Sequence, residues 1–146
     1  MTYTFTLPFK LESLNTFSGY SGGRKIHWFK QKIGEHLFPQ VNNAKIKGLP
    51  FERVRIKVVC YRRRLIEDVQ DNLPASLKPL LDALQPPIKC KPSKRFPDGL
   101  KATYRVGVIA NDNPDCIIEL DYKQFKDWNN QKTEIQITDV RSIKEM

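Results

Sequence analysis

EDVQDNLPASLKPLLDAL, residues 67–84, has the apolar spacing of an amphipathic helix. At about 100° per residue, one helical stripe holds Leu73, Leu77, Leu80, Leu81 and Leu84. The opposite face brings Asp71, Lys78 and Asp82 within roughly 40° of one another. The stretch therefore predicts a helix that leucines hold to a core, while two carboxylates and an amine share its other surface.

We expect this helix to cover residues 73–85. Asp71 or Asn72 would cap its free N–H groups, and Pro74 suits the first turn of a helix. Pro79 lies inside the predicted helix and should kink it or remove one backbone hydrogen bond.

Strand patterns precede and follow this helix in the sequence. Residues 3–9 alternate apolar side chains with threonine up to Pro8, and residues 52–61 form the clearest strand. In that strand, one side is apolar and faces the core, and the other side is mostly basic. After the helix we expect strands at 104–110, 116–122 and 133–138, with a tight turn at 111–115.

The remaining segments divide into a second helix and connections. We expect a helix at 26–38, loops or connectors at 10–23 and 39–50, and a short helix or turn at 123–131. Together the elements predict a single α+β domain over residues 1–146, built on a mixed β-sheet with two main helices. Residues 86–103 are an insertion rich in proline and lysine, either a solvated loop or a nucleic-acid contact.

The charge of the chain favours a polyanionic partner. Its 146 residues carry a net charge of +9, and the excess is clustered, which favours nucleic acid over simple solubility. The predicted phosphate contacts are Arg53, Arg55, Lys57, Arg62, Arg63 and Arg64, together with Arg24 and Lys25 after the glycine-rich loop.

The compartment is expected to be the cytoplasm, with the protein on the nucleoid when it binds DNA. Cys60, Cys90 and Cys116 form no close pair and are expected to be reduced thiols. No signal peptide is recognisable, and no apolar run approaches the roughly 20 residues of a membrane span.

Acidic residues gather at predicted element ends. Asp68 and Asp71 lie at the start of the central helix, and Asp112 lies in the predicted turn. Carboxylates that converge in this way suit Mg²⁺ or Mn²⁺, which can activate water for phosphodiester cleavage. Lys78 could then neutralise charge that grows on the phosphate. Asp at a helix start is also a common cap, and Asp in such a segment a common turn residue, so both interpretations stay open.

The order of these parts resembles the RusA family of Holliday-junction resolvases. Phe5-Thr6-Leu7-Pro8 with Ser13-Leu14-Asn15 is similar to the N-terminal strand and loop of that family. Arg62-Arg63-Arg64, Asp71-Asn72-Leu73, Lys78 and Asp82-Ala83-Leu84 resemble its central signature, and residues 107–112 resemble its later Gly…Asp-Asp segment.

The resemblance implies a metal-dependent endonuclease that acts as a homodimer on branched DNA. It gives Asp71 and Asp112 the role of metal ligands and Lys78 the role of the helix lysine. Val69 stands where the family has its first Asp, so Asp68, or else Glu67, is the candidate replacement. Asn111 stands in place of the first Asp of the later pair, and Asp71 and Lys78 are further apart than in the family.

The leading hypothesis is a Mg²⁺-dependent (or Mn²⁺-dependent) structure-selective endodeoxyribonuclease that resolves four-way junctions in recombination and repair. Asp68, Asp71 and Asp112 would bind the metal, and Lys78 would support the transition state. One alternative is a non-catalytic nucleic-acid-binding module that kept the fold. Another is a nuclease for other branched or flapped DNA. The acids are expected to meet at one edge of the sheet, flanked by the basic strand face.

Overall fold

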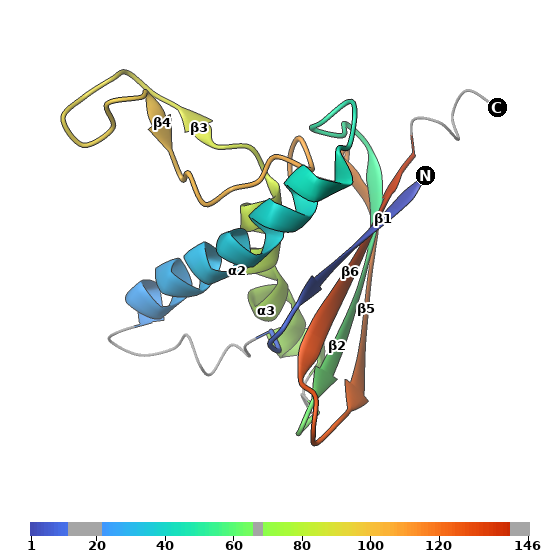
Figure 1. Cartoon of the computed structure of the whole chain (residues 1–146). Coiled ribbons are helices and arrows are strands. Elements are labelled where there is room, and N and C mark those ends of the chain that lie inside the picture. Colours follow the sequence, from blue (N-terminus) through green and yellow to red (C-terminus); the bar gives the residue numbers. More distant parts are fainter. Residues whose placement is uncertain (12–21, 66–68, 141–146) are drawn as a thin grey trace.

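A mixed four-stranded sheet forms one layer of the fold (Figure 1). The computed structural model describes the backbone of residues 1–11, 22–65 and 69–140, and the side chains of these residues except 22–23 and 69–76. The strand order is β1-β6-β2-β5, where the strands are β1 (Thr2–Leu7), β2 (Val54–Arg62), β5 (Ile117–Lys126) and β6 (Lys132–Asp139). β2 and β5 run parallel, and the other neighbours are antiparallel.

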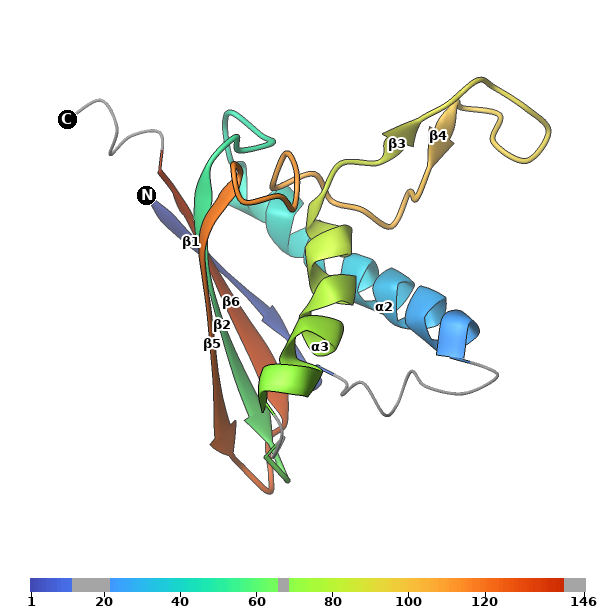
Figure 2. The ribbon, with the colours of Figure 1, turned by 180° about the vertical axis from the view of Figure 1, so that it is seen from behind.

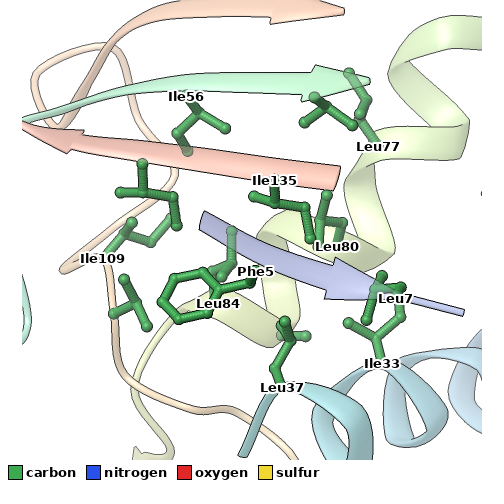
Figure 3. Close-up of a cluster of buried hydrophobic side chains, with 14 of the residues drawn as sticks. Phe5, Leu7, Ile33, Leu37, Ile56, Leu77, Leu80, Leu84, Ile109 and Ile135 are labelled. Carbon is green, nitrogen blue, oxygen red and sulfur yellow. The ribbon is translucent and has the colours of Figure 1, made fainter. Parts of the chain in front are cut away.

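Two helices, α2 (Gly22–Ala44) and α3 (Val69–Leu84), lie on the same face of this sheet (Figures 1 and 2). Between the layers, the core gathers Phe5, Leu7, Ile33, Leu37, Ile56, Leu77, Leu80, Leu84, Ile109 and Ile135 (Figure 3). The predicted α+β fold, with a mixed sheet and two main helices, is confirmed. Burial of Leu77, Leu80 and Leu84 also confirms that this part of the leucine stripe faces the core.

α2 is longer than the sequence predicts, and the expected connector at 39–50 is wrong up to Ala44. Pro39 lies inside the helix, which continues because tertiary contacts hold its last turns. Val41 is buried in the core. The Gln40 amide donates to the carbonyls of Thr6 (2.7 Å) and His36 (2.8 Å), and its oxygen accepts from the Thr6 N–H (2.8 Å).

α3 begins at Val69, four residues before the predicted start. Asp71 and Asn72 therefore lie within its first turns, so the prediction that one of them caps the helix from outside is wrong. Proline is only favoured in a first turn, and Pro74 falls further inside this helix. The helix also continues past Pro79 to Leu84.

The strand expected at 104–110 is absent, and only Ile109 forms an isolated bridge, to Phe51. Backbone N–H groups of the segment 104–110 instead donate to carbonyls at the end of α3. Val106 N–H donates to the Ala83 carbonyl (2.8 Å), Gly107 N–H to the Gln85 carbonyl (3.0 Å) and Val108 N–H to the Leu84 carbonyl (2.8 Å). The last carbonyls of a helix have no partner within it, so this segment satisfies them.

β5 continues to Lys126, so the short helix expected at 123–131 is wrong for its first residues. Residues 123–126 pair with residues 59–62 of β2, and this parallel pairing keeps them extended. A turn follows, in which the Asp127 carboxylate accepts from the N–H groups of Asn129 (3.0 Å) and Asn130 (3.1 Å). The strands expected at 3–9 and 133–138 are confirmed as β1 and β6.

Most of the segment 86–103 is a hairpin that projects from the body of the molecule (Figures 1 and 2). Its two short strands are β3 (Ile88–Lys89) and β4 (Leu100–Lys101). We call residues 88–101 the basic arm. The loop expected at 10–23 lies mostly outside the described residues, and α2 already begins at Gly22.

Replacing Gly34 by alanine is expected to destabilise the fold by about 1–3 kcal/mol. A Cβ at Gly34 in α2 would lie 2.1 Å from the backbone oxygen of Tyr104, so the chain after the basic arm would have to move. This cost opposes the roughly 0.5–1 kcal/mol by which alanine is favoured in a helix. Urea unfolding checks it, with the exposed neighbour Glu35→Ala as the matched control. Equal or greater stability of Gly34→Ala would contradict the close approach.

Candidate functional site

Lys78 of α3 and Asp112, residues that are 34 apart in the sequence, meet in the fold. The Lys78 Nζ lies 2.5 Å from Asp112 Oδ2 and 3.1 Å from Asp82 Oδ1. Asp112 reaches α3 because residues 106–109, which come just before it, are bonded to the carbonyl end of that helix. Its own N–H donates to the Asn111 side-chain oxygen (2.7 Å), which shapes the turn.

Asp82 joins this pair to α2. Its second oxygen, Oδ2, lies 2.8 Å from the Nζ of Lys30. The Asp82 side chain is only 8% exposed, so the predicted location on a solvent-facing surface is wrong. Lys30 of α2 and Lys78 cover its carboxylate, and a projection of α3 alone does not show the contact with α2. We call Lys30, Asp82, Lys78 and Asp112 the ion-pair chain.

Lys30 is the member of the ion-pair chain that the sequence analysis missed. A signal for it exists in α2. Ile26, Lys30, Ile33, Leu37 and Val41 follow one helical stripe, in which Lys30 is the one charged residue. A lysine inside an otherwise apolar stripe needs an anionic partner when the helix packs, and that partner comes from α3.

The ion pairs shift two titrations. The hydrogen bond to Asp112, and the weaker contributions of Asp82, raise the pKa of Lys78 above 10.5 against the opposing effect of partial burial. Burial is the largest single effect on Asp82 and disfavours its charge. The hydrogen bonds and charges of Lys30 and Lys78 together outweigh burial and lower the pKa of Asp82 below 3.8. Lys78 and Asp82 are therefore both ionised at neutral pH.

Asp71 is positioned by the backbone of α3. It precedes Lys78 by seven residues, nearly two helical turns, which puts both positions on the same side of α3. The Asp71 side chain, Asp68 and Glu67 lie outside the described part of the chain. The meeting of Asp68 and Asp71 with Asp112 therefore stays a prediction.

A metal ion fits one of the described acids by its chemistry. Asp112 is 27% exposed and contacts Lys78 through one oxygen, so it can offer a hard carboxylate ligand. Asp82 does not fit, because a lysine holds each of its oxygens. Among the side chains that the structure describes, no three His, Cys, Asp or Glu residues gather closely enough to hold an ion.

The predicted basic face of β2 is located on the other side of the sheet from the ion-pair chain. Val54, Ile56 and Val58 point into the core, under the helices, so Arg55 and Lys57 point away from them. The expectation that this face flanks the acids is therefore wrong for Asp112, the one of the three predicted metal ligands whose side chain the structure describes.

This outer face of the sheet is also less basic than the sequence of β2 alone suggests. Arg55 lies opposite Glu119 of β5, with Nε to Oε2 at 3.4 Å, and Lys57 lies opposite Asp121. These four side chains line one hollow with Gln136 and Thr138 of β6. The parallel partner strand thus supplies acids that offset the basic residues.

The other predicted phosphate contacts separate by exposure. Arg63, Arg64, Arg24 and Lys25 are exposed, and Arg53 is partly buried. Arg62 is 5% exposed, so its assignment to the basic surface is wrong. β2 continues through this residue, and the alternation of the strand turns Arg62 inward.

Arg62 instead ties together three parts of the backbone and core. Its Nη1 donates to the Leu11 carbonyl and contacts Cys60 Sγ at 3.9 Å, and its Nε donates to the Arg64 carbonyl at 3.2 Å. The guanidinium therefore fastens the segment after β1 to the end of β2.

Arg62→Met is expected to lower the free energy of unfolding by about 1–3 kcal/mol, because two carbonyls lose a charged donor. The exposed Arg64→Met is the matched control and should change stability by less than about 0.5 kcal/mol. Urea denaturation of the two variants checks this. A loss of DNA binding in Arg62→Met without any loss of stability would contradict the buried role.

A scan against protein-family models gave no match for this chain, and neither did a search of curated proteins. In the described segments, neither helix combines the length and apolar character that crossing a membrane requires. Cys60, Cys90 and Cys116 are all free thiols.

Proposed function

We propose that this chain is a divalent-metal-dependent endodeoxyribonuclease that cuts four-way DNA junctions as a homodimer. One observation carries the proposal. Lys78 and Asp112, to which the resemblance to RusA resolvases gives active-site roles, lie 2.5 Å apart although 34 residues separate them. This contact brings two residues with expected active-site roles to one place on the surface, as the proposed cleavage site requires.

Asp112 would hold Mg²⁺ or Mn²⁺ together with Asp71 and Asp68. When bound, the ion would supply an activated water and would stabilise the departing oxygen of the phosphodiester. Carboxylate oxygens are the ligands that these hard cations prefer. The family position occupied by Val69 has no ligand to offer, which makes Asp68 the third candidate.

Lys78 would stabilise negative charge on the scissile phosphate. Its side chain is 57% exposed, so it can turn from Asp112 toward a phosphate oxygen when DNA enters. The ammonium is protonated at neutral pH, and the two neighbouring carboxylates raise the pKa of Lys78 further. A full positive charge next to the scissile phosphate stabilises the charge that develops in the transition state.

Lys30 and Asp82 would position Lys78. Asp82 is buried and held by Lys30 from a second helix, so one side of the Lys78 ammonium has a fixed anchor. Rigid support of this kind keeps a reacting group within a narrow range of positions.

The substrate would be held by charge and shape. The exposed Arg63, Arg64, Arg24 and Lys25 would contact phosphates without reading bases. A four-way junction has two equivalent strands to cut, which suits a two-fold homodimer. Such an enzyme would act in the cytoplasm, on the nucleoid.

A substrate panel tests the proposal. Synthetic four-way junctions, forks, flaps and linear duplex would be incubated with the native chain in Mg²⁺, Mn²⁺ or a chelator. The expected result is metal-dependent cleavage of the junction at paired positions, with linear duplex uncut. Cleavage that persists in chelator, or no cleavage of any branched DNA, would overturn the proposal. Preferential cutting of flaps or forks would assign the alternative branched substrate, and sedimentation would test the dimer.

The second candidate is a nucleic-acid-binding module that has lost catalysis. Val69 and Asn111, which replace two acids of the family pattern, favour it. Tight binding of the junction in Mg²⁺ without any cleavage would select this candidate over the enzyme.

A further inference from the structure

The basic arm concentrates charge that the proposed active site does not use. Residues 88–101 hold five cations, Lys89, Lys91, Lys94, Arg95 and Lys101, against the single acid Asp98. The arm thus contributes +4 of the net charge of +9 from about a tenth of the chain. All five cations are exposed, and the arm projects away from the helices and sheet (Figures 1 and 2).

The tip of the arm is ordered by its own contacts. Cys90 N–H donates to the Gly99 carbonyl (2.9 Å), and Ser93 N–H donates to the Phe96 carbonyl (3.1 Å). The Phe96 ring lies under two cations, with Arg95 at 5.3 Å and Lys101 at 5.4 Å from its centroid. An isolated two-stranded hairpin is marginally stable in water, so these contacts matter for its shape.

The base of the arm is fixed to the helix that carries Lys78. The arm leaves shortly after Leu84, where α3 ends, and the returning chain bonds to the Ala83, Leu84 and Gln85 carbonyls. The same returning chain approaches α2 so closely at Gly34 that no Cβ fits there. Asp112 follows it within the same connection to β5. The base of the arm and the ion-pair chain are therefore both attached to the C-terminal part of α3.

We propose that the basic arm grips the phosphate backbone of duplex DNA beside the cleavage site and so orients the duplex relative to Lys78 and Asp112. This inference rests on the proposed function and names a contact that the function itself does not require. A two-stranded ribbon is narrow enough to lie along a groove of the duplex. The arm contains no Asn or Gln, and four of its five cations are lysines, which favours contacts with phosphates over base reading.

The chemistry of the tip favours DNA over an anionic membrane. Insertion into a membrane surface needs exposed apolar side chains at the leading end. The large exposed hydrophobic residues of the arm, Ile88 (46%) and Leu100 (36%), lie at its base, in the paired strands. Its tip presents Lys91, Lys94 and Arg95, and Phe96 there is partly buried.

The test compares two variants with the same loss of charge. In the arm variant, Lys89, Lys91, Lys94 and Arg95 become Gln; in the control, Lys45, Lys47, Lys123 and Lys126, four exposed lysines outside the arm, become Gln. Binding to a four-way junction is measured between 50 and 300 mM salt. Each lost phosphate contact should flatten the slope of log K against log salt by about 0.9, so the arm variant should lose about 2 or more. In the control, this slope should change by less than about 0.9, the value for one phosphate contact.

The outcomes separate this inference from the proposed function. A native chain that binds and cuts the junction, with an arm variant of unchanged salt slope, overturns the arm contact and leaves the nuclease standing. An equal change in both variants also overturns it, because net charge would then explain the binding. Arm-dependent binding to vesicles of anionic phospholipid, with unchanged junction binding, assigns the arm to a membrane and overturns the proposal. A native chain that binds no DNA overturns both.

Discussion

Lys78→Met is expected to slow junction cleavage about 100-fold or more while it leaves junction binding within a few-fold of native. The ammonium of Lys78 lies between two carboxylates in the fold, and its proposed work is to leave Asp112 and meet charge that develops on the phosphate. An interaction made mainly in the transition state lowers the rate more than the affinity when it is removed. Single-turnover cleavage and an equilibrium binding measurement on the same junction separate the two effects.

Two further variants sharpen this prediction. Lys78→Arg keeps a permanent cation and should recover part of the rate, whereas Lys45→Met removes an exposed lysine elsewhere and should leave the rate unchanged. A Lys78→Met variant that cuts at the native rate would show that this amine has only a structural role.

Asp82→Ala is expected to destabilise the fold by about 3 kcal/mol, because it leaves Lys30 partly buried without its carboxylate. Lys30 is 22% exposed and Asp82 only 8%, so water can replace little of the lost interaction. The double variant Lys30→Met with Asp82→Leu removes both charges and should recover a large part of the loss. Urea denaturation of the native chain, Lys30→Met, Asp82→Leu and the double variant completes the cycle, and Asp82→Ala is measured beside them.

The pH dependence of stability gives an independent check of the same contact. The pKa of Asp82 is lowered on folding, so its contribution is fully present above about 3.8 and is lost as the pH falls through the lowered value. The gap in stability between native and Asp82→Asn should therefore be constant near neutral pH and should shrink below pH 4. A gap that stays unchanged in acid would mean that Asp82 draws no stability from its ionised form.

Local patterns predicted the elements that bury a simple face. The period-two pattern of Val54, Ile56 and Val58 and the helical spacing of Leu77, Leu80 and Leu84 were sufficient for β2 and for the core face of α3, because burial follows directly from each local period. The N-terminal and C-terminal strands were equally visible.

Features that depend on distant partners could not be read from the chain. Arg55 and Lys57 appeared as a basic face because the register that places Glu119 and Asp121 opposite them is set by the whole sheet. Residues 104–110 alternate like a strand, but the N–H groups of residues 106–109 donate to carbonyls at or just after the end of α3. α2 continues beyond Pro39 because the Gln40 side chain is hydrogen-bonded to Thr6 of β1 and Val41 is buried in the core.

For the candidate site, the sequence and the resemblance together named Lys78 and Asp112, which the fold brings together. They missed Lys30, because an ion pair between two helices depends on how those helices cross. They also misplaced Arg62, because the strand was expected to end one residue earlier, at 61. The local period of side chains was thus a better guide than the expected ends of elements.

Cleavage of a four-way junction by Asp112→Asn tests the proposed active site most directly. In saturating Mg²⁺, Asp112→Asn and Asp71→Asn should both lose at least about 100-fold in single-turnover rate, because the amide that replaces each carboxylate is a poor metal ligand. Asp115→Asn, an exposed change in the same turn as Asp112, should cut at the native rate. Equal cleavage by Asp112→Asn, Asp115→Asn and the native chain would contradict the assignment of Asp112 and Lys78 to a metal-dependent cleavage site.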